Sequence, residues 1–278
     1  MQENFVLSRS PLGFHRVAYT EWGRASDKPP VICVHGLTRN GRDFDYLADN
    51  LQENTQVFCP DMVGRGKSDD LADPMYYGYP QYLADMTLMI ARTGAASIDW
   101  VGTSMGAIIG MLLAAENNTP IRRLVVNDVG PFIPLLALKR IGAYAGAKTE
   151  FADVKEAEAY MRKIYATFGD LSDDNWRHLA AHGTRKLPNG RLTLACDPNI
   201  AQPFLMLDQD VDIWAAYDRI RCPVLLLRGL QSDILSPDVA QQMTTRGPKA
   251  QLVEFPQTGH APALMAADQL ALVGDFLA

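Results

Sequence analysis

The chain has 278 residues, of which 26 are basic and 32 acidic, so its formal net charge is −6. With 47% apolar and 21% charged residues it has the composition of an ordinary soluble globular protein, long enough for one large domain or two smaller ones. The negative charge and the lack of a Lys/Arg block argue against nucleic acid as a partner. The longest uncharged stretch, Trp100 to Ala115, is too short to span a membrane.

The amino terminus and the cysteines indicate a reduced, cytoplasmic protein. The first residues have neither the basic start nor the apolar centre of a secretion signal, so we expect the mature chain to begin near Met1. The four cysteines, Cys33, Cys59, Cys196 and Cys222, show no CxxC spacing, and three of them lie in or beside apolar segments. We therefore expect free, mostly buried thiols.

Short segments of strand character alternate with segments of helical spacing along most of the chain. Phe5–Ser8 and His15–Trp22 predict an antiparallel edge at the start. Helical spacing occurs from Phe44 to Leu51 and from Tyr82 to Ile90. Six further segments predict buried strands: Val31–His35, Gln56–Pro60, Ser97–Thr103, Ile121–Asp128, Pro223–Arg228 and Ala250–Phe255. This alternation predicts an α/β fold with a mostly parallel sheet and helices on both faces.

The alternation breaks after Asp128, and residues 129–219 contain no strand of the buried type. Apolar residues from Val154 to Phe168 predict an amphipathic helix that ends at Gly169, and a second helix is expected to begin near Ser172. We interpret residues 129–219 as a helical insertion on the carboxyl edge of the sheet. Residues 1–128 and 220–278 are then the core.

The segment Gly102-Thr103-Ser104-Met105-Gly106 has the GxSxG pattern between a predicted strand and a predicted helix. A serine on such a turn is held in a strained conformation, and the glycines let the neighbouring backbone pass without a clash. The hydroxyl then stands exposed above the sheet, and the Met105 N–H at the helix start can bind an oxyanion. Ser104 is the predicted nucleophile.

A serine hydroxyl needs a general base, and the base needs an orienting carboxylate. His260 is the best candidate for the base, because it lies in a loop between the last predicted strand and the final helix. Such a loop falls on the carboxyl edge of a parallel sheet, beside the serine turn. Asp233 follows the predicted strand Pro223–Arg228 and is the favoured acid, in the chain order Ser104, Asp233, His260.

These motifs resemble those of the α/β-hydrolase family over essentially the whole chain. Val34–Leu37 resembles the family's oxyanion loop, and Asp61–Asp69 resembles its turn after the fourth strand. The resemblance implies an eight-stranded sheet, a helical cap inserted after the sixth strand, and an oxyanion hole made by the backbone N–H groups of Leu37 and Met105. It also leaves Asp128 as an alternative acid, because some members place theirs at the end of the sixth strand.

The predicted activity is cleavage of a small or medium carboxylic ester through an acyl-enzyme, with no metal or organic cofactor. Carbon–carbon bond hydrolysis of a dienoate and lactone hydrolysis use the same triad and stay open. A small-molecule receptor with a slow triad is the alternative of another class, and a perhydrolase is a third. The oligomeric state is not indicated. The pocket candidates, equally explained as core of the insertion, are Phe132, Ile133, Phe204, Met206 and Trp214.

Three other motifs are interpreted as structural. Gly64–Ser68 ends like a phosphate-binding loop, but Asp61 stands where that motif requires a glycine, so we expect a tight turn. His178 and His182 are four residues apart, as zinc ligands can be, but no acidic residue lies between them. Lys186–Arg191 contains Pro188 and predicts a turn.

Overall fold

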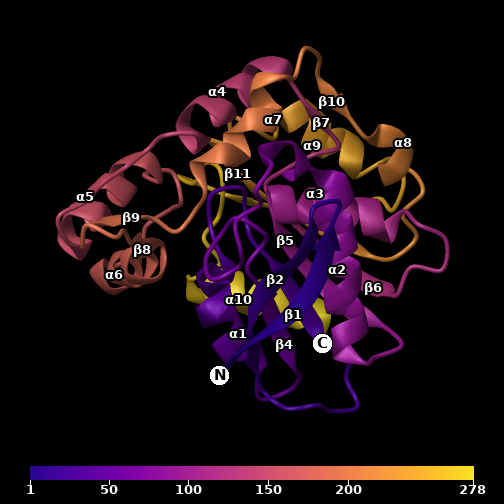
Figure 1. The fold of residues 1–278 in the computed structure, drawn as a ribbon. Helices are drawn as coiled ribbons and strands as arrows, with labels where there is room; N and C mark the ends of the chain where they lie inside the picture. The colour runs from indigo at the N-terminus through magenta and orange to yellow at the C-terminus, as the bar shows by residue number, and fades with distance from the viewer.

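The computed structural model covers residues 1–278 and contains one eight-stranded sheet, drawn in Figure 1. The strand order is β1-β2-β4-β3-β5-β6-β11-β12. β2 pairs antiparallel with β1 and β4, and every other neighbouring pair is parallel. The bounds are β1 Gln2–Ser10, β2 Gly13–Trp22, β3 Val31–Val34, β4 Val57–Pro60, β5 Ile98–Thr103, β6 Ile121–Asn127, β11 Val224–Gly229 and β12 Gln251–Phe255. The α/β class and the antiparallel edge predicted from the sequence are confirmed.

Helices cover both faces of this sheet. The helices of the core are α1 Asp45–Leu51, α2 Tyr79–Thr93, α3 Met105–Ala114, α9 Pro237–Met243 and α10 Ala267–Leu277, with short 3₁₀ helices at Gly41–Phe44 and Pro74–Tyr76. Alternate strand residues face opposite layers: Val31 and Cys33 pack with α1 and α10, whereas Ile32 and Val34 pack with α2 and α3. Every residue of β3 and β11 is buried, which explains their apolar runs Val31–Val34 and Val224–Leu227.

The segment between β6 and β11 carries its own small elements. They are β7 Phe132–Ile133, α4 Leu135–Ala145, α5 Val154–Ile164, α6 Asp173–His182, β8 Thr184–Lys186, β9 Leu192–Leu194, a 3₁₀ helix at Pro198–Ala201, α7 Gln202–Leu205, β10 Val211–Asp212 and α8 Trp214–Tyr217. β7 pairs only with β10, and β8 only with β9. In Figure 1, α5, α6, β8 and β9 project to the left of the sheet, and α4 and α7 lie together above it.

The two helices predicted in this segment are present. α5 begins after Asp153, whose side chain accepts the Glu156 N–H, and it ends at Ile164, five residues before the predicted end. α6 begins after Ser172, which forms a capping box with Asn175. The short strand pairs were not predicted, because two- and three-residue strands leave no periodic pattern. The helix α4 was not predicted either. The predicted turn at Lys186–Arg191 joins β8 to β9.

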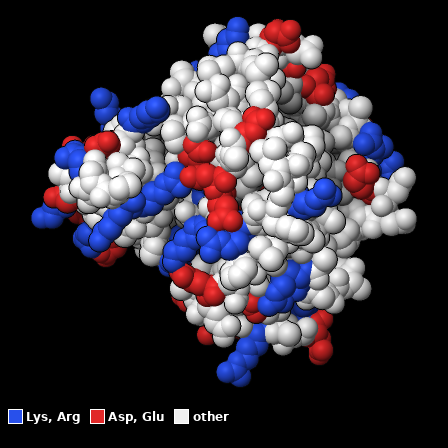
Figure 2. Space-filling view, in the orientation of Figure 1, with Lys and Arg blue, Asp and Glu red and all other residues white.

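The surface charges, the cysteines and the lengths of the helices agree with the expectations from the sequence. Basic and acidic groups are interspersed on the face shown in Figure 2. Ion pairs between surface residues include Lys67–Glu3 and Arg16–Asp69. All four cysteines are free and three are buried, as expected. No helix combines the length and the apolar character that crossing a bilayer requires.

Candidate active site

Ser104 occupies a strained turn between β5 and α3. Its φ is 52° and its ψ is −115°, a conformation that few residues with a side chain adopt. The turn is possible because the residues two positions before and two positions after Ser104 are glycine. A Cβ at Gly106 would overlap the carbonyl of Val34, and one at Gly102 would overlap the backbone of the first turn of α3. The glycine spacing read in the sequence thus follows from close backbone approach at this turn.

The imidazole of His260 joins Ser104 to a buried carboxylate. His260 Nε2 lies 2.9 Å from Ser104 Oγ, and His260 Nδ1 lies 2.8 Å from Asp128 Oδ2. A carboxylate only accepts, so Nδ1 carries the proton and donates to Asp128, which leaves Nε2 to accept the serine hydroxyl. The three residues follow β5, β6 and β12, whose carboxyl ends meet at one edge of the sheet.

Asp128 is held by more than the histidine. Its carboxylate accepts the Gly229 N–H at 2.8 Å and the Ser232 hydroxyl at 2.6 Å, and the residue is fully buried. Its backbone N–H donates to the Leu227 carbonyl of the neighbouring strand β11 at 2.8 Å. A buried charge is tolerated where hydrogen bonds replace water, and here three donors serve the two oxygens.

The preference for Asp233 as the partner of His260 is wrong in this structure. Asp233 forms an ion pair with Arg140 of α4, makes no hydrogen bond with His260, and is about half exposed. Both acids follow strands that end at the same edge, so strand position could not separate them. The direction of the two side chains distinguishes the two acids. Asp128 points across β11 toward His260, whereas Asp233 points toward the segment after β6.

Two backbone N–H groups beside Ser104 are free to donate. Neither the Leu37 nor the Met105 N–H makes a hydrogen bond within the protein. Both residues line the same cavity as Ser104. Gly36 brings the Leu37 loop against the serine, since a Cβ at Gly36 would lie 3.7 Å from the Ser104 Cβ. This arrangement suits an oxyanion that forms next to Ser104 Oγ.

Arg65 supports the Leu37 loop and was missed as a functional residue. It is fully buried, and its Nε donates to the Leu37 carbonyl at 2.8 Å. Its Nη1 donates to the Val63 carbonyl at 2.7 Å and to the Tyr82 hydroxyl at 3.0 Å. The sequence signal was the turn itself: Gly64 and Gly66 adopt φ of 82° and 57°, as the tight-turn interpretation requires, and hold the arginine inward.

His35 precedes the same loop and is neutral. Its Nδ1 donates to the Gly36 carbonyl at 2.7 Å, and its Nε2 accepts the Met62 N–H at 2.9 Å. Only a neutral ring with the proton on Nδ1 satisfies both partners. Burial lowers the pKa of His35 to about 3, because the charged form loses its hydration. His35 therefore ties the loop to the segment after β4 without adding charge to the site.

The cavity above Ser104 has a volume of about 420 Å³. Of the predicted pocket residues, Ile133 and Phe204 line it. Phe132, Met206 and Trp214 do not line it, so these three predictions are wrong. Phe132 neighbours Ile133 in a strand, where successive side chains point in opposite directions. Met206 is 67% exposed. The ring of Trp214 packs against the guanidinium of Arg246, whose Cζ lies 4.0 Å from the ring centre.

Other apolar residues that line the cavity were not recognised from the sequence. Leu138, Ile141 and Tyr144 come from α4 at a spacing of three residues, which places them on one face of that helix. The signal was therefore present, but no helix was predicted there. The unrecognised lining residues include Leu138, Ile141, Tyr144, Ile164 and Phe168.

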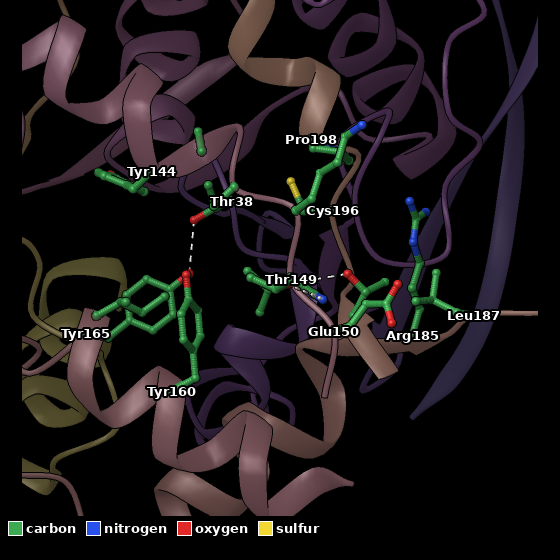
Figure 3. Close-up of a pocket in the computed structure, with 16 residues that line it drawn as sticks. Thr38, Tyr144, Thr149, Glu150, Tyr160, Tyr165, Arg185, Leu187, Cys196 and Pro198 are labelled. Atoms are coloured by element: carbon green, nitrogen blue, oxygen red, sulfur yellow. Dashed lines mark hydrogen bonds between the residues drawn. The ribbon is translucent and has the colours of Figure 1, made fainter. Parts of the chain in front are cut away.

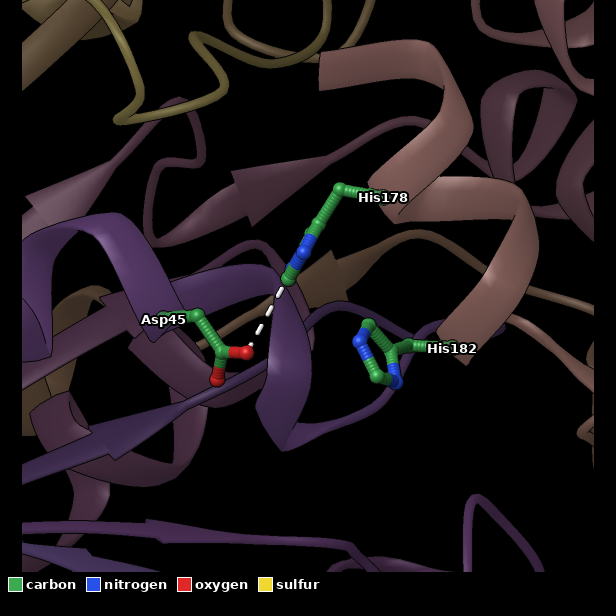
Figure 4. Close-up of side chains that lie close together, drawn as sticks. All are labelled: Asp45, His178 and His182. Carbon is green, nitrogen blue, oxygen red and sulfur yellow. Dashed lines mark ion pairs between the residues drawn. The ribbon is translucent and has the colours of Figure 1, made fainter. Parts of the chain in front are cut away.

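A cluster of two histidines and an acid lies outside this cavity (Figure 4). Donor atoms of Asp45, His178 and His182 all lie within 4.8 Å of one another, a separation that a metal ion could bridge. Arg42 already supplies positive charge here: its Nε donates to Asp45 at 2.8 Å, and its Nη1 lies 3.2 Å from His182 Nδ1. His178 also contacts the Arg42 carbonyl at 2.9 Å. The cluster links α1 to α6 as an ion-pair network.

Comparisons with known proteins agree with this geometry. Residues 31–272 match the family model of the alpha/beta hydrolase family. A 3-hydroxybutyrate-oligomer hydrolase of Cupriavidus necator is 42% identical over 98% of this chain and 96% of its own. A 2-(acetamidomethylene)succinate hydrolase of Mesorhizobium japonicum is 27% identical over 93% and 90%. A solved alpha/beta hydrolase from Novosphingobium aromaticivorans has a TM-score of 0.89 and 36% identity, covering 99% and 97% of the two chains.

Proposed function

The chain belongs to the alpha/beta hydrolase family, and from this premise we propose that it hydrolyses the ester bonds of short hydroxyalkanoic acid oligomers, with Ser104 as nucleophile. The observation that carries the proposal is the continuous hydrogen-bonded series from Ser104 through His260 to Asp128, next to two unpaired backbone N–H groups. That combination is what acyl transfer to water requires.

In the first step His260 Nε2 removes the Ser104 proton while the serine oxygen attacks the ester carbonyl. Charge collects on the carbonyl oxygen, where the N–H groups of Leu37 and Met105 stabilise it. The C–O bond then breaks, and His260 returns the proton to the departing alcohol. Water then attacks the acyl-enzyme while His260 removes its proton, and His260 returns that proton to Ser104 as the acid is released. Asp128 stabilises the imidazolium in both steps.

The charge of the cavity favours a neutral reacting group. Its two arginines are both paired: Arg39 binds Asp43 through two hydrogen bonds of 2.6 and 2.9 Å, and Arg140 binds Asp233. A succinate substrate carries two carboxylates, so the cavity would need cations that are not already paired with an acidic residue. An ester within a hydroxyalkanoate oligomer is uncharged, which agrees with the 42% identical relative. In this proposal residues 129–219 form the cap that shapes the cavity.

The test is release of 3-hydroxybutyrate from its linear dimer, followed by chromatography. We expect release by the unaltered protein, no release by Ser104→Ala, and normal release by Ser26→Ala, which changes an exposed serine outside the cavity. A fluorophosphonate should add its mass to Ser104 in the unaltered protein. Tight binding of the dimer without release would indicate a receptor instead, and release by Ser104→Ala at the normal rate would refute the nucleophile assignment.

A further inference from the structure

A second cavity of about 230 Å³, whose lining is drawn in Figure 3, adjoins the cavity above Ser104. Four residues line both cavities, so the two cavities meet at Thr38, Tyr144, Ile164 and Tyr165. At this junction the hydroxyls of Thr38 and Tyr165 are hydrogen-bonded at 3.1 Å, as a dashed line in Figure 3 marks. Thr38 directly follows Leu37, so the junction lies one residue from a proposed oxyanion donor.

The lining of this second cavity combines apolar surface with hydroxyl groups. Nine of its sixteen lining residues are hydrophobic, and its polar groups include the tyrosine hydroxyls of Tyr144 and Tyr160. Neither of these two hydroxyls has a hydrogen-bond partner within the protein, whereas the Tyr165 hydroxyl is engaged with Thr38. Free hydroxyl donors on an apolar wall suit a ligand that carries carbonyl acceptors along an apolar chain.

The charged residues of the second cavity leave one cation without a partner. Arg185 pairs with Asp70 at 3.1 Å, and Glu150 pairs with Arg191 at 3.3 Å. Lys148 is exposed and forms no ion pair. In the cavity above Ser104, by contrast, both arginines are paired. An ammonium at the cavity rim is available to one carboxylate.

We propose that this second cavity is a subsite for the carboxylate-bearing end of a linear hydroxyalkanoate oligomer. The inference rests on the proposed function and specifies which part of the substrate lies where. The reacting ester lies at Ser104, and the leaving-alcohol side of the chain extends past Thr38 and Tyr165. There the hydroxyls of Tyr144 and Tyr160 donate to ester carbonyls, and Lys148 binds the terminal carboxylate. In such an oligomer the leaving-alcohol side is the side that carries the free carboxylate, because each acyl group belongs to the hydroxyl end.

Filling the second cavity tests this assignment. Ala147 lies at its rim, so Ala147→Trp should obstruct it, whereas Ala143→Trp adds the same side chain at an exposed position of α4 that lines neither cavity. We expect Ala147→Trp to lower the ratio of tetramer to dimer kcat/KM at least about tenfold, and Ala143→Trp to keep the ratio of the unaltered protein. A normal ratio in Ala147→Trp would overturn the subsite while release from the dimer continued to support the proposed function.

The charge is tested separately with the tetramer and its methyl ester. Lys148→Gln should raise KM for the free acid severalfold and leave the methyl ester unchanged, and Lys148→Arg should preserve the preference for the acid. Equal KM values of the unaltered protein for acid and methyl ester would reject the role of Lys148. Failure of the unaltered protein to cleave either dimer or tetramer would overturn the proposed function and the subsite together.

Discussion

His260 Nδ1 lies 2.8 Å from Asp128 Oδ2, although Asp233 follows the adjacent strand and, like His260, lines the cavity above Ser104. The two acids differ in what surrounds them. Asp128 is fully buried and accepts three hydrogen bonds, whereas Asp233 is about half exposed and pairs with Arg140. A carboxylate in the first environment can orient an imidazole and balance its charge during reaction.

Asp128→Asn is therefore expected to reduce kcat for ester hydrolysis by about 10⁴, because the amide holds the histidine in the wrong tautomer. Asp233→Asn should reduce it by less than about tenfold, since it disturbs only an exposed ion pair. Steady-state hydrolysis of p-nitrophenyl acetate measures both, and circular dichroism checks that each variant folds. The reverse order of effects would reassign the acid to Asp233.

Arg65→Met should destabilise the fold and slow the chemical step. It leaves the carbonyls of Leu37 and Val63 without their buried donor, so we expect a loss of about 3–5 kcal/mol in the free energy of unfolding. Arg92→Met, which removes a half-exposed guanidinium, should cost under about 1 kcal/mol. Urea unfolding measures both values. A distorted Leu37 loop should also lower kcat more than it raises KM; equal stability of the two variants would contradict the supporting role of Arg65.

His35 makes stability depend on pH. Its pKa is lowered from 6.5 to about 3 in the folded state, so the unfolded chain binds the proton more readily. This contribution to stability is complete above pH 6.5 and is lost as the pH falls toward 3, by about 2 kcal/mol at pH 5. Nitrogen-15 spectra of the imidazoles should show the Nδ1–H form of His35 down to pH 4. Protonation of the folded protein near pH 6.5 would contradict the assignment.

Metal removal should leave the protein unchanged. Arg42 supplies the positive charge between Asp45 and the histidines of α6, so a chelator has nothing to withdraw there. We expect the same Tm and the same ester hydrolysis before and after dialysis against EDTA. Added zinc should not raise Tm at micromolar concentration; a rise that disappears in His182→Ala would show that the ion displaces Arg42.

The local features of this protein could be predicted because a few neighbouring residues determine them. Ser104 could be identified from its flanking glycines, since the backbone passes too closely for any Cβ at Gly102 or Gly106. The parallel strands carry runs of apolar residues, such as Val31–Val34 and Val224–Leu227, because helices cover both faces of the sheet. The capped start of α6 likewise follows from Ser172 and the residues next to it.

The choice of acid and the lining of the cavity were decided only by the tertiary structure. Asp128 and Asp233 both follow strands at one edge, and only the packing of β6 beside β11 turns one of them toward His260. Ile133 lines the cavity and Phe132 does not, although they are adjacent in sequence. The physical reason is that local patterns record backbone conformation over a few residues, whereas contacts between separate loops depend on strand order and on the direction of each side chain.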